Sequence, residues 1–69
     1  MKIYQLSQIG ARIANNTNAP DTSNWRVIYA LSKMGYGTPD QIALQTGLEE
    51  GEVNNALVML KHRNIVTER

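Results

Sequence analysis

Apolar residues recur along much of the chain at the three- and four-residue spacing that marks one face of an α-helix. The pattern is clearest over residues 50–63, where four apolar positions share a face. These positions are Val53, Ala56, Leu57 and Leu60. Asn64 follows this helix and suits the left-handed backbone that often ends one. A similar pattern predicts a helix over residues 24–34, capped by Ser23 or Asn24. Its buried positions are Val27, Ala30, Leu31 and Met34, with Ile28 widening the face.

A third helix is predicted over residues 39–46 from the signals at its two ends. Thr38 suits the N-cap, Pro39 suits the first turn, and Gln41 completes a capping box three residues after Thr38. Gly47 then ends the helix, because glycine adopts the left-handed conformation at little cost.

A fourth helix is predicted over residues 8–15, with Ser7 as its N-cap. Its apolar stripe is expected to contain Ile9, Ile13 and Ala14. Gly10 weakens an isolated helix by about 1 kcal/mol relative to alanine. We therefore expect tertiary packing to hold this helix in place.

Short β-branched or extended segments predict strands at residues 2–6 and 65–67. A lone strand leaves its backbone groups unpaired, so these two are expected to pair with each other in an antiparallel sheet. Residues 35–38 are expected to add a short third strand. Residues 15–24 are rich in turn-forming residues and are predicted to form a polar connection.

The 69 residues allow one small domain spanning 1–69. The order of elements is strand, four helices, strand. This order predicts an α+β fold that is mostly α, with a small antiparallel sheet pairing the two terminal strands.

Composition argues against several classes of protein. Seven Lys and Arg against six Asp and Glu give a net charge of +1, too small for binding nucleic acid by charge alone. With no Cys and one His, the chain lacks the ligands of a usual zinc site. It also lacks a phosphate-binding glycine loop and a nucleophile with a plausible base. We therefore expect no enzyme, no catalytic residues, no metal and no cofactor. Without a long apolar run or signal peptide, we expect a cytoplasmic location and no membrane contact.

Three residues stand at the spacing of a helix-turn-helix. Ala43 is small enough for a helix crossing, Gly47 stands four residues later at the turn, and Val53 lies six residues further on in the second helix. Residues 38–58 resemble that family. The run from Leu60 to Val66 is similar to the helix-to-strand junction of winged-helix domains. The winged-helix resemblance covers residues 25–69, with the helix-turn-helix at about 38–63.

The resemblance has one departure. A winged-helix domain normally continues into a hairpin, the wing, whereas this sequence ends at Arg69. Residues 3–10 resemble the strand and helix that usually follow the wing. We favour a wingless or rearranged variant in which the N-terminal strand fills the missing sheet position. The other interpretation is a fragment, or a dimer that exchanges strands.

The resemblance implies sequence-specific binding of double-stranded DNA, as by a transcriptional regulator, with residues 50–63 in the major groove. Asparagine can pair with adenine and valine can contact a thymine methyl group. The candidate base contacts on the face opposite the core are Gly51, Asn54, Asn55 and Val58. The candidate phosphate contacts are Arg26, Lys33, Lys61, His62 and Arg63.

Two features of the same helix favour a different partner. Glu49, Glu50 and Glu52 stabilise its N-terminus through the helix dipole but repel phosphates. Exposed Val58 and Met59 suit a protein interface. The alternative is a wingless helix-turn-helix module that binds protein, either a second copy in a homodimer or another protein, or a dimerising fragment of a larger regulator.

Overall fold

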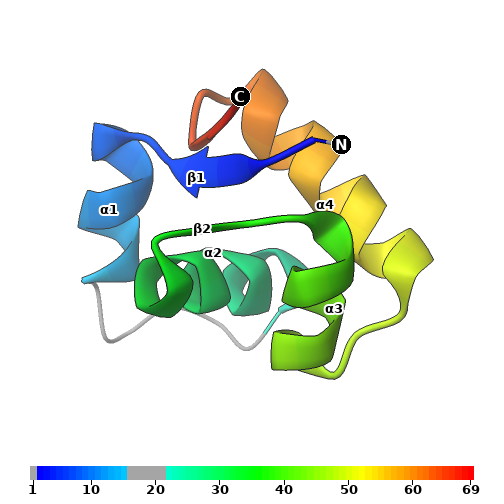
Figure 1. The fold of residues 1–69 in the computed structure, drawn as a ribbon. Helices are drawn as coiled ribbons and strands as arrows, with labels where there is room; N and C mark the ends of the chain where they lie inside the picture. The colour runs from blue at the N-terminus through cyan, green and yellow to red at the C-terminus, as the bar shows by residue number, and fades with distance from the viewer. Residues whose placement is uncertain (1, 16–21) are drawn as a thin grey trace.

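The computed structural model describes residues 2–15 and 22–69, and these contain four helices packed with a three-stranded sheet (Figure 1). The elements in chain order are β1 (Tyr4–Leu6), α1 (Gln8–Ala14), α2 (Ser23–Met34), β2 (Tyr36–Gly37), α3 (Pro39–Thr46), α4 (Glu50–His62) and β3 (Val66–Glu68). The predicted α+β, mostly helical fold is confirmed. Most of the polar connection predicted at 15–24 lies outside the described residues.

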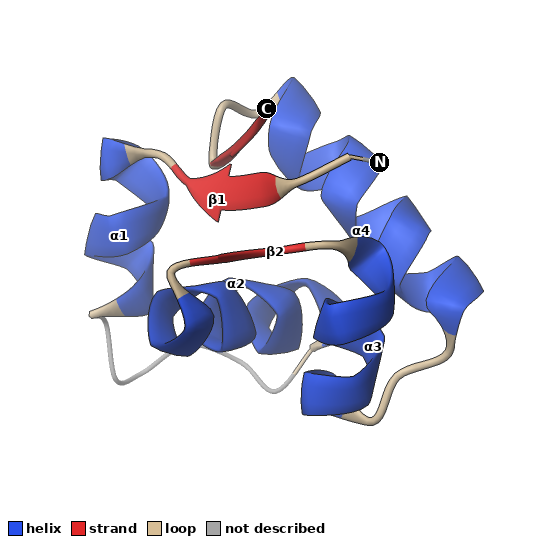
Figure 2. Ribbon diagram, in the orientation of Figure 1, coloured by secondary structure: helices blue, strands red, loops and turns tan. Residues whose placement is uncertain are grey.

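The N-terminal strand occupies the centre of the sheet (Figure 2). The strand order is β2-β1-β3, and β1 runs antiparallel to both neighbours. Tyr4 stands opposite Glu68, and the pairing continues where the Arg69 amide donates to the Ile3 carbonyl oxygen at 2.7 Å. The predicted pairing of the terminal strands is therefore confirmed, and so is the short third strand. β1 is shorter than expected, and β3 begins one residue later, at Val66.

The core lies between α2, α3, α4 and the sheet. Its fully buried side chains are Leu31, Ile42, Leu57, Val27, Val53 and Val66. The face predicted for residues 50–63 is confirmed, because all four of its apolar residues are buried in α4. Met34 of α2 is only partly buried, since it sits at the last turn of its helix.

Local signals fix most helix ends as predicted. The Thr38 hydroxyl accepts from the Gln41 amide, and the Gln41 side chain accepts from the Thr38 amide, which completes the capping box. Gly47 has the left-handed backbone with φ of 75°, and Asn64 has φ of 61°. The expected cap of α2 is wrong by one residue. Thr22 takes that role, because its hydroxyl accepts from the Trp25 amide at 3.2 Å.

Helix α1 turns a different face inward from the one predicted. Gly10 is its buried residue, and a Cβ at that position would lie 2.2 Å from the Ile65 carbonyl oxygen. This close approach rotates Ile9 outward, so that 53% of its surface is exposed. Ile13 and Ala14 pack against the core as expected. The apolar stripe predicted for this helix is therefore wrong at Ile9.

Candidate functional site

The outward face of α4 carries all four residues predicted to contact bases. Gly51, Asn54, Asn55 and Val58 are exposed, and Val58 has 70% of its surface accessible. They point away from the core because Val53, Ala56, Leu57 and Leu60 hold the opposite side of the helix against α2 and the sheet. Gly47 ends α3 in the left-handed conformation, and a short connection leads from it into α4.

One edge of the α4 face is joined to the start of α2. The Ser23 hydroxyl donates to Glu52 Oε2 at 3.2 Å, and Asn24 Nδ2 donates to Met59 Sδ at 3.6 Å. Both Glu52 and Met59 remain exposed. These contacts place Glu52 and Met59 on the α2 side of the face.

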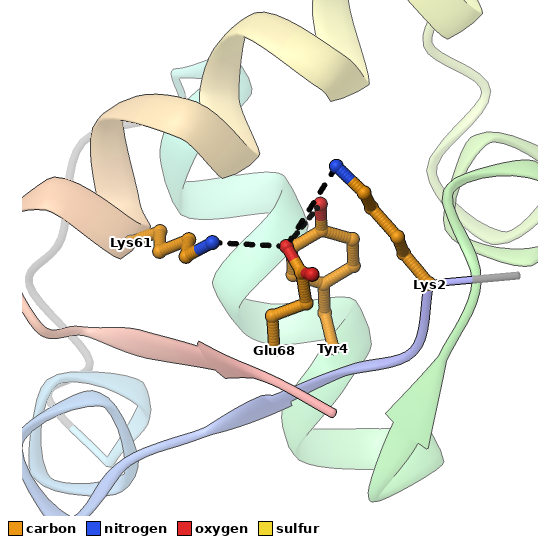
Figure 3. A network of polar contacts seen from close by, with 4 residues as sticks. All are labelled: Lys2, Tyr4, Lys61 and Glu68. Carbon is orange, nitrogen blue, oxygen red and sulfur yellow. Dashed lines mark hydrogen bonds and ion pairs between the residues drawn. The ribbon is translucent and has the colours of Figure 1, made fainter.

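The opposite edge of the face meets the sheet through a polar cluster (Figure 3). Three groups converge on Glu68 Oε1 of β3. Lys61 Nζ of α4 lies at 2.9 Å and Lys2 Nζ at 4.0 Å. The Tyr4 phenol of β1 donates to the same oxygen at 3.4 Å. We call Lys2, Tyr4, Lys61 and Glu68 the Glu68 cluster.

The Glu68 cluster shifts the pKa values of three of its groups. The hydrogen bond from Lys61 lowers the pKa of Glu68 below its ordinary value, and the same contact raises the pKa of Lys61. Burial raises the pKa of Tyr4, with the negative charge of Glu68 as the next cause. The cluster therefore favours a carboxylate, an ammonium and a neutral phenol.

A shallow hollow lies between α4 and the sheet and includes the Glu68 cluster. Its lining residues are Lys2, Tyr4, Asn55, Val58, Met59, Lys61, His62 and Glu68. The hollow brings two predicted base contacts, Asn55 and Val58, beside two predicted phosphate contacts, Lys61 and His62. Val58, Lys61 and His62 come from the second half of α4, and Asn55 lies just before its midpoint, three residues after Glu52.

The structure places the other predicted phosphate contacts elsewhere. Arg26 and Lys33 line a separate cleft between α2 and α3, where Lys33 Nζ stands 5.3 Å from the centre of the Tyr29 ring. Trp25 also lines this cleft, with its ring centre 6.4 Å from that of Tyr29. Arg63 follows α4 as its C-cap and is exposed. Among the described residues, the two hollows share no lining residue.

Sequence reasoning missed Lys2, Tyr4 and Glu68 as parts of the site. Pairing the terminal strands was predicted, and that pairing is what carries Lys2 and Tyr4 to Glu68. The register that sets Tyr4 opposite Glu68 depends on packing across the whole sheet, so the strand pattern alone did not give it.

The described residues 2–15 and 22–69 contain no group of three or more His, Cys, Asp or Glu that could hold a metal ion. Of the helices in those ranges, none is long and apolar enough to cross a bilayer. Comparison with family models, curated proteins and solved structures gave no match for this chain.

Proposed function

We propose that this chain binds double-stranded DNA in a sequence-specific manner, as a transcriptional regulator, through a helix-turn-helix formed by α3 and α4. One observation carries the proposal. The exposed face of α4 from its middle to its C-terminal end combines amide and apolar side chains with neighbouring cations, namely Asn55 and Val58 beside Lys61 and His62. Such a mixture suits base edges and adjacent phosphates at once.

The dimensions and charges of α4 favour contact through its C-terminal half. Its 13 residues extend about 20 Å, enough to lie along a major groove. Glu50 and Glu52 lie in the first turn, where they favour the helix and repel phosphates. Entry by the second half separates these carboxylates from the DNA backbone and brings Lys2 and Lys61 towards it.

The sheet also supports a rearranged winged-helix architecture. β3 follows α4, as a strand follows the recognition helix in that family. β1 lies between β2 and β3 and is antiparallel to both, in the position that the strand after the wing would take. Within the proposal, β1 replaces that strand, and the end of the sheet beside Lys2 stands near the DNA.

A salt titration of binding to random-sequence duplex DNA tests the proposed function. We expect binding at low salt that weakens steeply as salt rises, because phosphate contacts release counterions. Absence of binding at low salt, with a basic control protein binding normally, would contradict the proposal.

Two substitutions then separate the roles of residues on α4. Asn55→Ala is expected to flatten the preference among sequences selected from a random library. Lys61→Ala is expected to weaken all sequences alike and to reduce the salt slope by about 1. Equal effects of the two changes on sequence preference would show that the assigned roles are wrong.

A second candidate function is protein binding through the same face. Val58 and Met59 are neighbours on α4, with 70% and 49% of their surfaces exposed. An interface favours such side chains at its centre. Sedimentation of the wild type and of Val58→Asp distinguishes this function if it involves a homodimer. A concentration-dependent dimer lost in the variant would support it, and a monomer at all concentrations would exclude self-association.

A further inference from the structure

The Glu68 cluster resembles an anion-binding site in which the Glu68 carboxylate is the bound anion. Two ammonium groups and a phenol hydroxyl, from α4 and the N-terminal segment, gather around one carboxylate oxygen. Figure 3 shows Lys2, Tyr4 and Lys61 directed at Glu68 from different sides. An oxygen of a phosphodiester accepts hydrogen bonds from the same donors as a carboxylate oxygen does.

The cations of this cluster are free to exchange one anion for another. The side chains of Lys2 and Lys61 are 68% and 53% exposed, whereas that of Glu68 is 24% exposed. Lysine side chains are long and flexible, and exposed ion pairs contribute little to stability. Turning these two ammonium groups from Glu68 towards a phosphate outside the protein therefore costs little.

The cluster also stands where a phosphate would come. Lys2, Lys61 and Glu68 line the hollow that contains Asn55 and Val58, the proposed base contacts. A base pair held against Asn55 brings backbone phosphates to the rim of the same hollow, because each base is joined to the backbone within one nucleotide.

We propose that Lys2, Tyr4 and Lys61 form a binding site for a DNA backbone phosphate, and that Glu68 occupies it in the free protein as a competing anion. This inference rests on the proposed function. In the complex, Lys2 and Lys61 turn from Glu68 to the phosphate, and the Tyr4 hydroxyl stays at the base of the site. Glu68 therefore weakens DNA binding, and it does so equally for all sequences because a phosphate carries no base identity.

The experiment compares Glu68→Gln with Glu50→Gln by equilibrium binding to random duplex DNA across a range of salt concentrations. Both variants remove one negative charge. Glu50 begins α4, whereas Glu68 contacts Lys61 near the other end of that helix. Glu68→Gln is expected to tighten binding about two- to fivefold more than Glu50→Gln, since surface ion pairs are weak competitors. Repeating both changes in a Lys2→Ala, Lys61→Ala background should abolish the difference.

The outcomes separate the inference from the proposed function. The inference is supported if Glu68→Gln raises DNA affinity more than Glu50→Gln does and if this difference disappears without Lys2 and Lys61. Binding by Glu68→Gln alone also supports it. Equal gains from the two Gln variants overturn the inference and leave DNA binding intact. A gain that persists without Lys2 and Lys61 also overturns it. If no variant binds at low salt, both proposals fail. Circular dichroism of each variant confirms that it is folded before binding is compared.

Discussion

At the scale of single residues, position 10 requires glycine because no space is left for a side chain, although glycine is a poor helix former. Its position in the sequence suggested only a weak point in a short helix. In the structure, a Cβ at this position would lie 2.2 Å from the Ile65 carbonyl oxygen and 2.9 Å from Leu6 Cδ2. The need for glycine thus comes from Ile65, 55 positions away along the chain. The pattern of residues around Gly10 does not reveal this contact.

Gly10→Ala is expected to destabilise the protein although alanine favours helices. Overpacking of this kind costs about 1–3 kcal/mol, and here the obstacle is backbone. Gly51→Ala is the matched control, because among the described residues its Cβ would meet nothing within 4 Å. That change should stabilise by about 0.5–1 kcal/mol. Urea unfolding measures the free energy of unfolding of both variants. An equal increase in the two would show that α1 does not approach Ile65 closely.

Glu68 should make stability depend on acid pH. Its pKa is lowered in the folded protein by Lys61 and returns to the ordinary 4.5 on unfolding. The unfolded chain therefore binds more protons, so this contribution is fully present above about pH 4.5 and is lost as pH falls through the folded pKa. The urea midpoint should fall between pH 6 and pH 3 in both proteins, and the fall should be smaller in Glu68→Gln than in the wild type. Identical falls would contradict a contribution of the Lys61–Glu68 ion pair to stability.

At the scale of elements, helix ends were predictable and helix faces were less so. The capping box at Thr38 and the positive φ of Gly47 and Asn64 follow from chemistry within a few residues, and the structure contains all three. α4 has a long apolar repeat and its buried face was predicted in full. α1 spans only seven residues, and the closeness of its neighbours decides its orientation.

We expect the packing of α3 against α4 to be sensitive to the size of the side chain at position 43. Ala43 is partly buried against the core, whereas its neighbour Leu44 has 87% of its surface exposed. Ala43→Trp is expected to force the two helices apart and to destabilise by about 1–3 kcal/mol or more. Leu44→Trp should change the free energy of unfolding little. Thermal unfolding followed by circular dichroism compares them, and similar melting temperatures would show that Ala43 does not lie at the helix crossing.

At the scale of the whole molecule, pairing of the terminal strands links fold and site. β1 enters the sheet beside β3 and so brings Lys2 and Tyr4 to the edge of α4. The net charge of +1 conceals an uneven distribution. Glu49, Glu50 and Glu52 gather at the start of α4, whereas Lys2, Lys61 and His62 line the hollow beside its second half, together with Glu68.

The candidate site was predictable only in part, for a reason that also lies at this scale. The exposed residues of α4 follow from its helical period, so Asn54, Asn55 and Val58 were identified from sequence. Arg26 and Lys33 were grouped with them, but the structure puts these two in the cleft between α2 and α3. The packing of helices against one another decides which cations lie on the same surface. Residue spacing within one helix does not predict that packing.

We propose that the outward face of α4 contacts DNA over residues 55–62. Backbone amide NMR spectra of the protein, recorded at low salt during titration with duplex DNA, test it most directly. We predict that the largest shifts occur at Asn55, Val58 and Lys61, with accompanying shifts at Lys2 and Glu68. Shifts confined to Trp25 and Tyr29 of the other cleft, or no shifts at all, would contradict the claim.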